Sequence, residues 1–247
     1  MMINNLLVHV LIIGSPQYLV KAFRASNIQA FAFVPCGLRA TSTEQETPQP
    51  ATSSYDTSSP SSKGLVSALT DLVNGFNKST PASLYNRGPA PMTKEELMKF
   101  LDQDYTVNNY LWTGDLSLEA FDEQCTFQDP TISFQGLSTY HTNVQNLAKV
   151  VRWATNNQVE QKTKSILLDI QCDEHYVETR WNMVGELTAL PWNPCIDVIG
   201  RTKFWYRSNS QGELKVYKYD EEWEMSAAKA LWQLVTPSSA SKKLIEF

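Results

Sequence analysis

Asp129 is the residue best placed for acid-base chemistry, and it lies in the run Cys125-Thr-Phe-Gln-Asp-Pro130. This run is expected to be extended, because a residue before proline avoids the helical region. A carboxylate in a largely apolar cavity can act as a base, since desolvation raises its pKa. An aspartate before proline also commonly accepts hydrogen bonds from a turn. Both roles stay open, so the sequence does not decide whether the chain is an enzyme.

Side chains on later segments are candidates for a pocket lining. Arg180 and Trp181 are neighbours on an expected strand, so they point to opposite faces and at most one faces a cavity. Tyr217 and Tyr219 are two residues apart and are expected to share a face, where they either wall a pocket or pack under helices. His141, in an expected helix, is interpreted as a surface or capping group.

Several kinds of chemistry find no support in the sequence. The four cysteines have no C-x-x-C spacing and there are three histidines, so we expect no metal site and no cofactor. A Gly-x-Ser-x-Gly elbow is absent, which removes the usual signal for a serine hydrolase. The net charge of −5 argues against nucleic acid as a partner.

Hydrophobic spacing predicts three helices and then four long strands. Thr93-Lys-Glu-Glu96 is a capping box that starts the first helix, which is expected to run to about Trp112. Near residue 157 the spacing of apolar residues changes from about 3.6 residues, typical of a helix, to 2 residues, typical of a strand. The remaining expected elements are helices at 118–122 and from 136 to 151, strands near 166–170, 176–187, 197–207 and 213–222, and a last helix at 227–235. Short connections predict an antiparallel sheet whose length favours strong curvature.

Residues 1–62 differ in composition from the rest of the chain. No Asp or Glu occurs in residues 1–43, where Lys21, Arg24 and Arg39 are spaced among Ser and aliphatic residues. This is typical of a plastid or mitochondrial transit peptide, although the apolar run at 6–13 also fits a secretory signal. It is too short to span a bilayer, and we expect no integral membrane segment. Residues 41–62 are rich in Ser, Thr and Pro and are expected to be a disordered linker.

The domain organisation follows from these patterns. After residues 1–62, an apolar stripe at 65–76 predicts a short helix, which with its Pro-rich connector fills 63–92. The folded domain is expected at 93–237 and a tail at 238–247.

Several motifs of this domain resemble the nuclear transport factor 2-like (SnoaL-like) superfamily, and more narrowly its plant and cyanobacterial branch of unknown function. They are Trp112-Thr-Gly-Asp115, Phe121, the run ending in Asp129-Pro130, Gly136, and Tyr219-Asp220-Glu-Glu-Trp223. The resemblance implies an α+β fold in which N-terminal helices pack over a strongly curved antiparallel sheet. This cone-shaped, cystatin-like roll ends in a C-terminal helix and has an apolar pocket at its wide end.

Ketosteroid isomerase belongs to the same superfamily, and the resemblance gives Asp129 the role of its proton-shuttling base. Two other positions depart from that enzyme. Its oxyanion-hole aspartate matches Gly200, and its oxyanion-hole tyrosine matches Val107. Tyr105 and Tyr110 are displaced along the helix and are expected to point elsewhere. A base without oxyanion donors supplies only part of the rate enhancement, so steroid-type isomerisation is not expected. Tyr105 stays among the pocket candidates.

The function expected from these features is binding of a small apolar molecule, or an accessory interaction role, in a chloroplast protein, with the mitochondrion as the alternative location. One alternative function is an isomerase, dehydratase or cyclase that uses Asp129 as acid and base. Another is a dimeric scaffold, because open sheets can pair face to face as a homodimer through an exposed apolar surface.

The leader gives a direct prediction. A fluorescent reporter fused behind residues 1–62 should enter the plastids of a plant cell, because this segment lacks acidic residues up to Thr43 and carries spaced basic ones. Fluorescence microscopy checks the outcome, and secretion of the reporter would contradict it.

Overall fold

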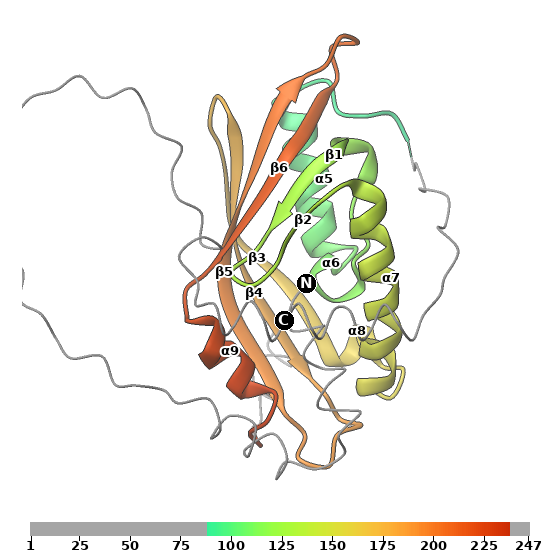
Figure 1. The fold of residues 1–247 in the computed structure, drawn as a ribbon, viewed down its shortest axis with the longest axis vertical. Coiled ribbons are helices and arrows are strands. Elements are labelled where there is room, and N and C mark those ends of the chain that lie inside the picture. The colour runs from blue at the N-terminus through green and yellow to red at the C-terminus, as the bar shows by residue number, and fades with distance from the viewer. Residues whose placement is uncertain (1–87, 238–247) are drawn as a thin grey trace, which may run out of the picture.

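The computed structural model describes residues 88–237, which form one curved sheet with helices on both sides (Figure 1). The expected leader, linker, 65–76 helix and C-terminal tail lie outside the described residues. The strands, in the order β2-β1-β6-β5-β4-β3 across the sheet, are β1 Phe121–Gln128, β2 Ser133–Gln135, β3 Thr163–Cys172, β4 Tyr176–Glu186, β5 Cys195–Ser208 and β6 Leu214–Trp223. The helices are α5 Lys94–Thr106, α6 Tyr110–Thr113, the 3-10 turn η1 Leu118–Ala120, α7 Leu137–Ala154, α8 Val159–Lys162 and α9 Ala227–Gln233.

The expected α+β order of helices, strands and a final helix is confirmed. Figure 1 shows α5, α6 and α7 on one side of the sheet and α9 on the other, beside β5. The four long strands β3 to β6 form an antiparallel meander. The sheet is not antiparallel throughout, because β1 pairs parallel to β6 and antiparallel to β2. No short hairpin joins β1 to β6, so chain connectivity does not impose an antiparallel direction on that pair.

A bulge in β6 changes which tyrosines face the helices. Trp205 pairs with Lys218 while Tyr206 pairs with Val216, so Tyr217 is an extra residue without a partner in the β5 register. One inserted residue reverses the inward and outward alternation of a strand. Tyr219 is therefore buried while Tyr217 is 36% exposed. The expectation that these two tyrosines share a face is wrong.

The first helix starts where the sequence predicts and ends earlier. Thr93 is the N-cap, and its hydroxyl accepts from the Glu96 amide at 3.2 Å. The Glu96 carboxylate accepts from the Met92 amide at 2.7 Å, one residue before the position expected for a capping box. The helix then stops at Thr106, so the expected continuous run to Trp112 is in fact two helices, α5 and α6.

Asn109 causes this break. Its backbone is left-handed, with φ of 50°, a conformation that asparagine tolerates better than most residues. Its side-chain oxygen accepts from the Ser165 amide at 2.6 Å and from the Ser165 hydroxyl at 2.7 Å. Its amide donates to the Thr163 hydroxyl at 3.0 Å. The edge strand β3 thus holds the break in place, and Tyr110, Leu111 and Trp112 of α6 turn inward and are buried.

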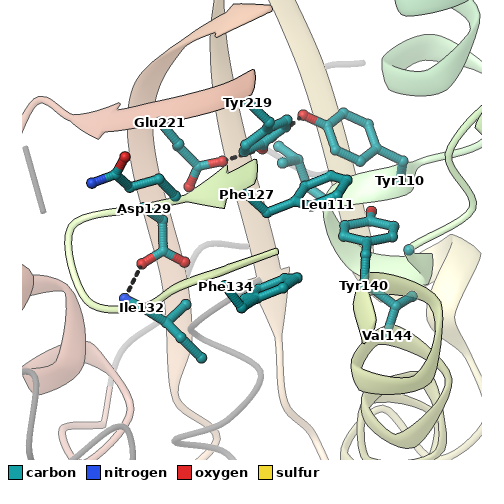
Figure 2. Close-up of a pocket in the computed structure, with 12 residues that line it drawn as sticks. Tyr110, Leu111, Phe127, Asp129, Ile132, Phe134, Tyr140, Val144, Tyr219 and Glu221 are labelled. Atoms are coloured by element: carbon teal, nitrogen blue, oxygen red, sulfur yellow. Dashed lines mark hydrogen bonds between the residues drawn. The ribbon is translucent and has the colours of Figure 1, made fainter. Parts of the chain in front are cut away.

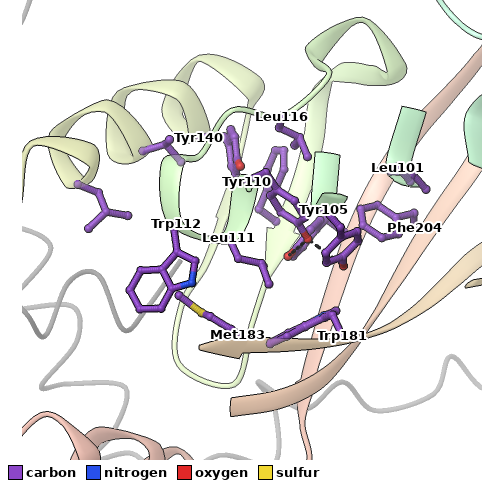
Figure 3. Close-up of a cluster of buried hydrophobic side chains, with 14 of the residues drawn as sticks. Leu101, Tyr105, Tyr110, Leu111, Trp112, Leu116, Tyr140, Trp181, Met183 and Phe204 are labelled. Carbon is purple, nitrogen blue, oxygen red and sulfur yellow. Dashed lines mark hydrogen bonds between the residues drawn. The ribbon is translucent and has the colours of Figure 1, made fainter. Parts of the chain in front are cut away.

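Large aromatic side chains fill the space between α5, α6 and the sheet (Figure 3). Trp112 and Trp181 are almost fully buried, and each lies against a glycine. A Cβ atom at Gly185 would lie 2.3 Å from the Trp112 ring, and one at Gly200 would lie 2.5 Å from the Trp181 ring. These two positions must stay without a side chain because the indoles occupy the space.

A buried carboxylate ties α5 to the segment after α6. Asp104 accepts from the Ser117 hydroxyl at 2.7 Å, from the Ser117 amide at 3.1 Å and from the Asn108 amide at 2.9 Å. Burial raises the pKa of Asp104 to about 7, even though these hydrogen bonds favour the charged form. The contact fixes the end of α5 against η1.

We expect Asn109→Ala to lower the free energy of unfolding by about 2 to 3 kcal/mol, because the Ser165 amide and the Ser165 hydroxyl lose their acceptor. Asn193→Ala is the matched control, since Asn193 also has a positive φ, of 43°, but is exposed. Denaturant unfolding of the two variants separates the side-chain contacts from the backbone effect. Equal losses of unfolding free energy in the two variants would show that the contacts of Asn109 with β3 do not contribute to stability.

Candidate functional site

A small cavity lies between β1, the β1–β2 turn, α6 and α7 (Figure 2). Its volume is about 20 Å³, which is enough for about one water molecule. Its lining combines aromatic and aliphatic side chains with two carboxyl groups. The lining residues are Tyr110, Leu111, Gly114, Phe127, Gln128, Asp129, Ile132, Phe134, Tyr140, Val144, Tyr219 and Glu221. The side chains around this cavity nearly fill it.

Asp129 is buried at this cavity and also holds the β1–β2 turn. Its Oδ1 accepts from the Thr131 amide at 2.8 Å, the Thr131 hydroxyl at 2.5 Å and the Ile132 amide at 2.9 Å. Its own amide donates to the Ile132 carbonyl at 3.0 Å. Burial raises the pKa of Asp129, while these hydrogen bonds act in the opposite direction. One carboxylate oxygen thus has the structural role that an aspartate before proline is expected to have.

Glu221 is a second buried acid in the same cavity. Its Oε1 accepts from the Trp223 indole at 2.7 Å, and its Oε2 shares a short hydrogen bond with the Tyr219 hydroxyl. Burial raises the pKa of Glu221, and the nearby charge of Asp129 raises it further. The sequence pattern contained a signal for this residue, because Tyr219, Glu221 and Trp223 alternate along β6 and so share a face.

A chain of buried hydroxyls runs from Glu221 to the middle of the sheet. The Tyr219 and Tyr110 hydroxyls are 3.2 Å apart, and Tyr110 donates to Tyr105 at 3.0 Å. The Tyr105 hydroxyl is 2.7 Å from the Thr179 hydroxyl, which donates to the Thr202 carbonyl at 3.5 Å. Burial raises the pKa of each of the three tyrosines, so all remain protonated at neutral pH.

The protons of this chain can be assigned from its far end. The Thr202 carbonyl can only accept, so Thr179 donates to it, Tyr105 donates to Thr179 and Tyr110 donates to Tyr105. At the other end of the chain, the Tyr219 hydroxyl donates to Glu221 Oε2. Burial raises the pKa of Glu221, whereas the hydrogen bonds from Trp223 and Tyr219 lower it. Glu221 is therefore a buried acid at the head of an ordered chain of hydroxyls.

The candidates named from the sequence divide into two groups. Asp129 and Tyr219 line the cavity. Tyr105 lies one hydrogen bond behind it, and Trp181 is in the core, where its indole donates to the Thr202 hydroxyl at 2.9 Å. Arg180 is on the opposite face of β4 from Trp181 and forms two hydrogen bonds with Glu224, at 2.6 and 2.9 Å. Tyr217 is outside, with the Arg207 guanidinium 5.2 Å from its ring.

Three cavity residues were not expected there. Tyr110 was expected to point away, and it turns inward because α5 ends before it. Tyr140 is one helical turn before Val144 on α7, so the apolar stripe of that helix could have identified it. Glu221 was hidden in an acidic run whose exposed members look the same in sequence.

The structure shows the surroundings of the two positions at which this chain differs from the oxyanion-hole residues of ketosteroid isomerase. Gly200 faces the Trp181 indole, which fills the space where a side chain would project. Val107 is 74% exposed, just past the end of α5. Neither position offers a hydrogen-bond donor to the cavity.

Two further properties concern the described part of the chain. Within residues 88–237, no group of three or more His, Cys, Asp or Glu side chains is arranged to hold a metal ion. No helix in this range is long and apolar enough to cross a membrane.

Helices over a curved sheet, with a cavity between them, place this protein in the nuclear transport factor 2-like fold class that the motifs indicated. The chain belongs to the family described as "Uncharacterized conserved protein (DUF2358)", whose model matches residues 95–218. The comparison with curated proteins gave no match.

Solved structures with similarity to the chain include Bal32a, from a soil-derived mobile gene cassette. It has 16% identity and a TM-score of 0.38, over 56% of this chain and 95% of that chain. A hypothetical protein with a ketosteroid isomerase-like fold from Catenulispora acidiphila, in complex with trimethylamine, has 14% identity and a TM-score of 0.39, over 59% and 96%. A putative SnoaL-like polyketide cyclase from Jannaschia sp. CCS1 has 10% identity and a TM-score of 0.39, over 63% and 100%. At these scores, no function in those names transfers to this chain.

The contacts of Asp129 predict a clear difference between two substitutions. Asp129→Ala should cost about 1 to 3 kcal/mol of unfolding free energy, because the Thr131 and Ile132 amides lose their acceptor. Asp129→Asn keeps an acceptor oxygen, so its unfolding free energy should be closer to that of the wild type. Because burial raises the pKa of Asp129, the wild type should lose stability relative to Asp129→Asn as the pH rises from about 4 through that raised pKa.

Denaturant unfolding of the three proteins at pH 5 and pH 7 checks both expectations. An Asp129→Ala protein that is more stable than the wild type at pH 7, with an advantage that fades toward pH 5, would contradict the structural role of Asp129.

Proposed function

We propose that this chain is a plastid protein that binds a small, mostly apolar molecule with one polar group in the cavity between β1, α6 and α7. The observation that carries the proposal is the composition of the cavity wall. Aromatic side chains surround a site that ends in the buried acid Glu221 and the hydroxyl chain behind it. Ligand sites of this kind combine apolar walls with a few placed polar groups.

The aromatic wall is built around Phe127. The Phe127 ring stacks on Tyr140 with centroids 4.5 Å apart and on Phe134 with centroids 5.5 Å apart. Its distance to the Tyr219 ring is 5.7 Å. Flat rings at these positions suit a flat or cyclic ligand, because offset stacking adds to the energy of burying apolar area.

The present cavity volume requires that binding moves a side chain. Ile132 and Phe134 are only partly buried, and both lie at the β1–β2 turn, where β2 is a three-residue edge strand. We infer that these two side chains form the movable wall. Tyr110, Tyr140 and Tyr219 are almost fully buried and form the fixed one.

A second candidate function is proton transfer in an isomerase, dehydratase or cyclase, with Asp129 as acid and base. The specific observation in its favour is that Asp129 and Glu221 line one cavity, where each has a raised pKa. Two acids whose protonation depends on each other can act as a donor and acceptor pair. The hydrogen bonds from the turn to Asp129 Oδ1 favour the binding function over this one.

The dimeric scaffold alternative has less support. The outward face of the sheet carries the ion pairs Arg180–Glu224 and Arg201–Glu178. These charged pairs interrupt the apolar surface that pairing through an open sheet needs.

We expect Phe134→Ala to increase the affinity of the full-length chain for a small aromatic probe, 4-methylacetophenone, by severalfold, because the substitution opens the movable wall. Trp232→Ala is the matched control: Trp232 is a large, 46% exposed aromatic on α9 that is not part of the lining. Ligand-observed NMR titration measures both affinities. If neither the wild type nor Phe134→Ala binds the probe, or if both variants bind equally, the cavity is not the binding site.

A further inference from the structure

The hydroxyl of Tyr140 differs from the other tyrosine hydroxyls at the cavity. Tyr110 and Tyr219 are both used in the buried chain that ends at Thr202. Tyr140 is only 4% exposed, and its side chain has no hydrogen bond within residues 88–237. Burial is the main cause that raises the pKa of this hydroxyl. A hydroxyl at the cavity that has no partner in this range is available to donate its proton to a ligand atom.

The position of Tyr140 is fixed from two sides. Its backbone amide, in the first turn of α7, donates to the Gly136 carbonyl at 3.1 Å. Its ring stacks on Phe127 with an angle of 21° between the planes. Figure 2 shows the ring in the cavity wall beside Leu111 and above Val144. A donor held in this way loses little side-chain freedom when it binds a ligand.

The charges around Tyr140 select the kind of acceptor. Burial raises the pKa of Tyr140, and so do Asp104, Glu221 and Asp115. The hydroxyl therefore keeps its proton and can donate it. An anionic ligand would be poorly solvated in this mostly apolar cavity and would meet repulsion whenever Asp129 or Glu221 is ionised. A neutral oxygen acceptor meets no such repulsion.

We propose that Tyr140 anchors the ligand by donating a hydrogen bond to a neutral carbonyl oxygen. The preferred ligands are then cyclic or aromatic ketones and esters, with their ring against Phe127 in the space that opens when Phe134 moves. This inference rests on the proposed binding function and names the chemical class that the same cavity takes. Glu221 is not the anchor, because its two carboxyl oxygens already accept hydrogen bonds from Tyr219 and Trp223.

The test uses the full-length chain, three probes and two variants. The probes are 4-methylacetophenone, which has a neutral carbonyl, 4-ethyltoluene, which lacks one, and 4-methylbenzoate, which is anionic. Tyr140→Phe removes only the unpaired hydroxyl, whereas Tyr105→Phe removes a hydroxyl that is in the buried chain but not in the cavity lining. NMR titration gives the affinities, and infrared difference spectra give the carbonyl stretch of the bound ketone.

In the wild type the ketone should bind more tightly than the hydrocarbon, and the benzoate least. Tyr140→Phe should weaken ketone binding about fivefold, the effect of one hydrogen bond, without changing hydrocarbon binding. The bound carbonyl stretch should move to higher wavenumber in Tyr140→Phe and stay unchanged in Tyr105→Phe. Thermal unfolding should show a lower midpoint for Tyr105→Phe only, because only that variant breaks the buried chain.

Two failures are distinguishable. If the ketone and the hydrocarbon bind equally and Tyr140→Phe changes neither affinity nor the carbonyl stretch, the anchoring role is wrong while the binding function stands. If no probe binds, both the anchoring role and the binding function are wrong.

Discussion

The constraint on which this structure depends is that polar groups buried between the helices and the sheet must be hydrogen-bonded. Glu221, Tyr219, Tyr110, Tyr105 and Thr179 satisfy it by bonding one to the next. These residues come from β6, α6, α5 and β4, so one hydrogen-bonded chain joins the two layers of the domain. Each member is left without a partner if its neighbour moves. The chain therefore fixes the relative position of the elements.

The chain of hydroxyls exists only because the first helical run is interrupted. A continuous helix would place Tyr110 away from the cavity. Instead, Asn109 interrupts the helix, and its side-chain oxygen accepts hydrogen bonds from Ser165 of β3. Gly114 ends α6 with a φ of 70°, and a Cβ atom there would lie 1.5 Å from a Val144 methyl group. Close packing of α6 on α7 thus requires a glycine at this point, and it places Tyr140 beside α6.

The same packing explains the character of the cavity. Its fixed wall is formed by aromatic side chains held by stacking and by the buried chain, and its other wall lies at a short turn that Asp129 stabilises. A polar side held by hydrogen bonds and an apolar side at a short turn are the features on which the proposed binding of a small molecule rests. Asp129 serves this arrangement chiefly as the residue that shapes the turn.

The sequence by itself determined the order of the elements, the α+β class and the superfamily, because hydrophobic period, capping residues and the motifs around Asp129 and Tyr219 are local signals. It also identified Asp129 and Tyr219 as residues near a cavity. Tertiary structure decided the rest. The parallel pairing of β1 with β6, the bulge at Tyr217 and the break at Asn109 depend on contacts between residues far apart in the chain. Those contacts turn Tyr110 inward and bring it to the same cavity as Tyr140 and Glu221, and local patterns carry no record of that arrangement.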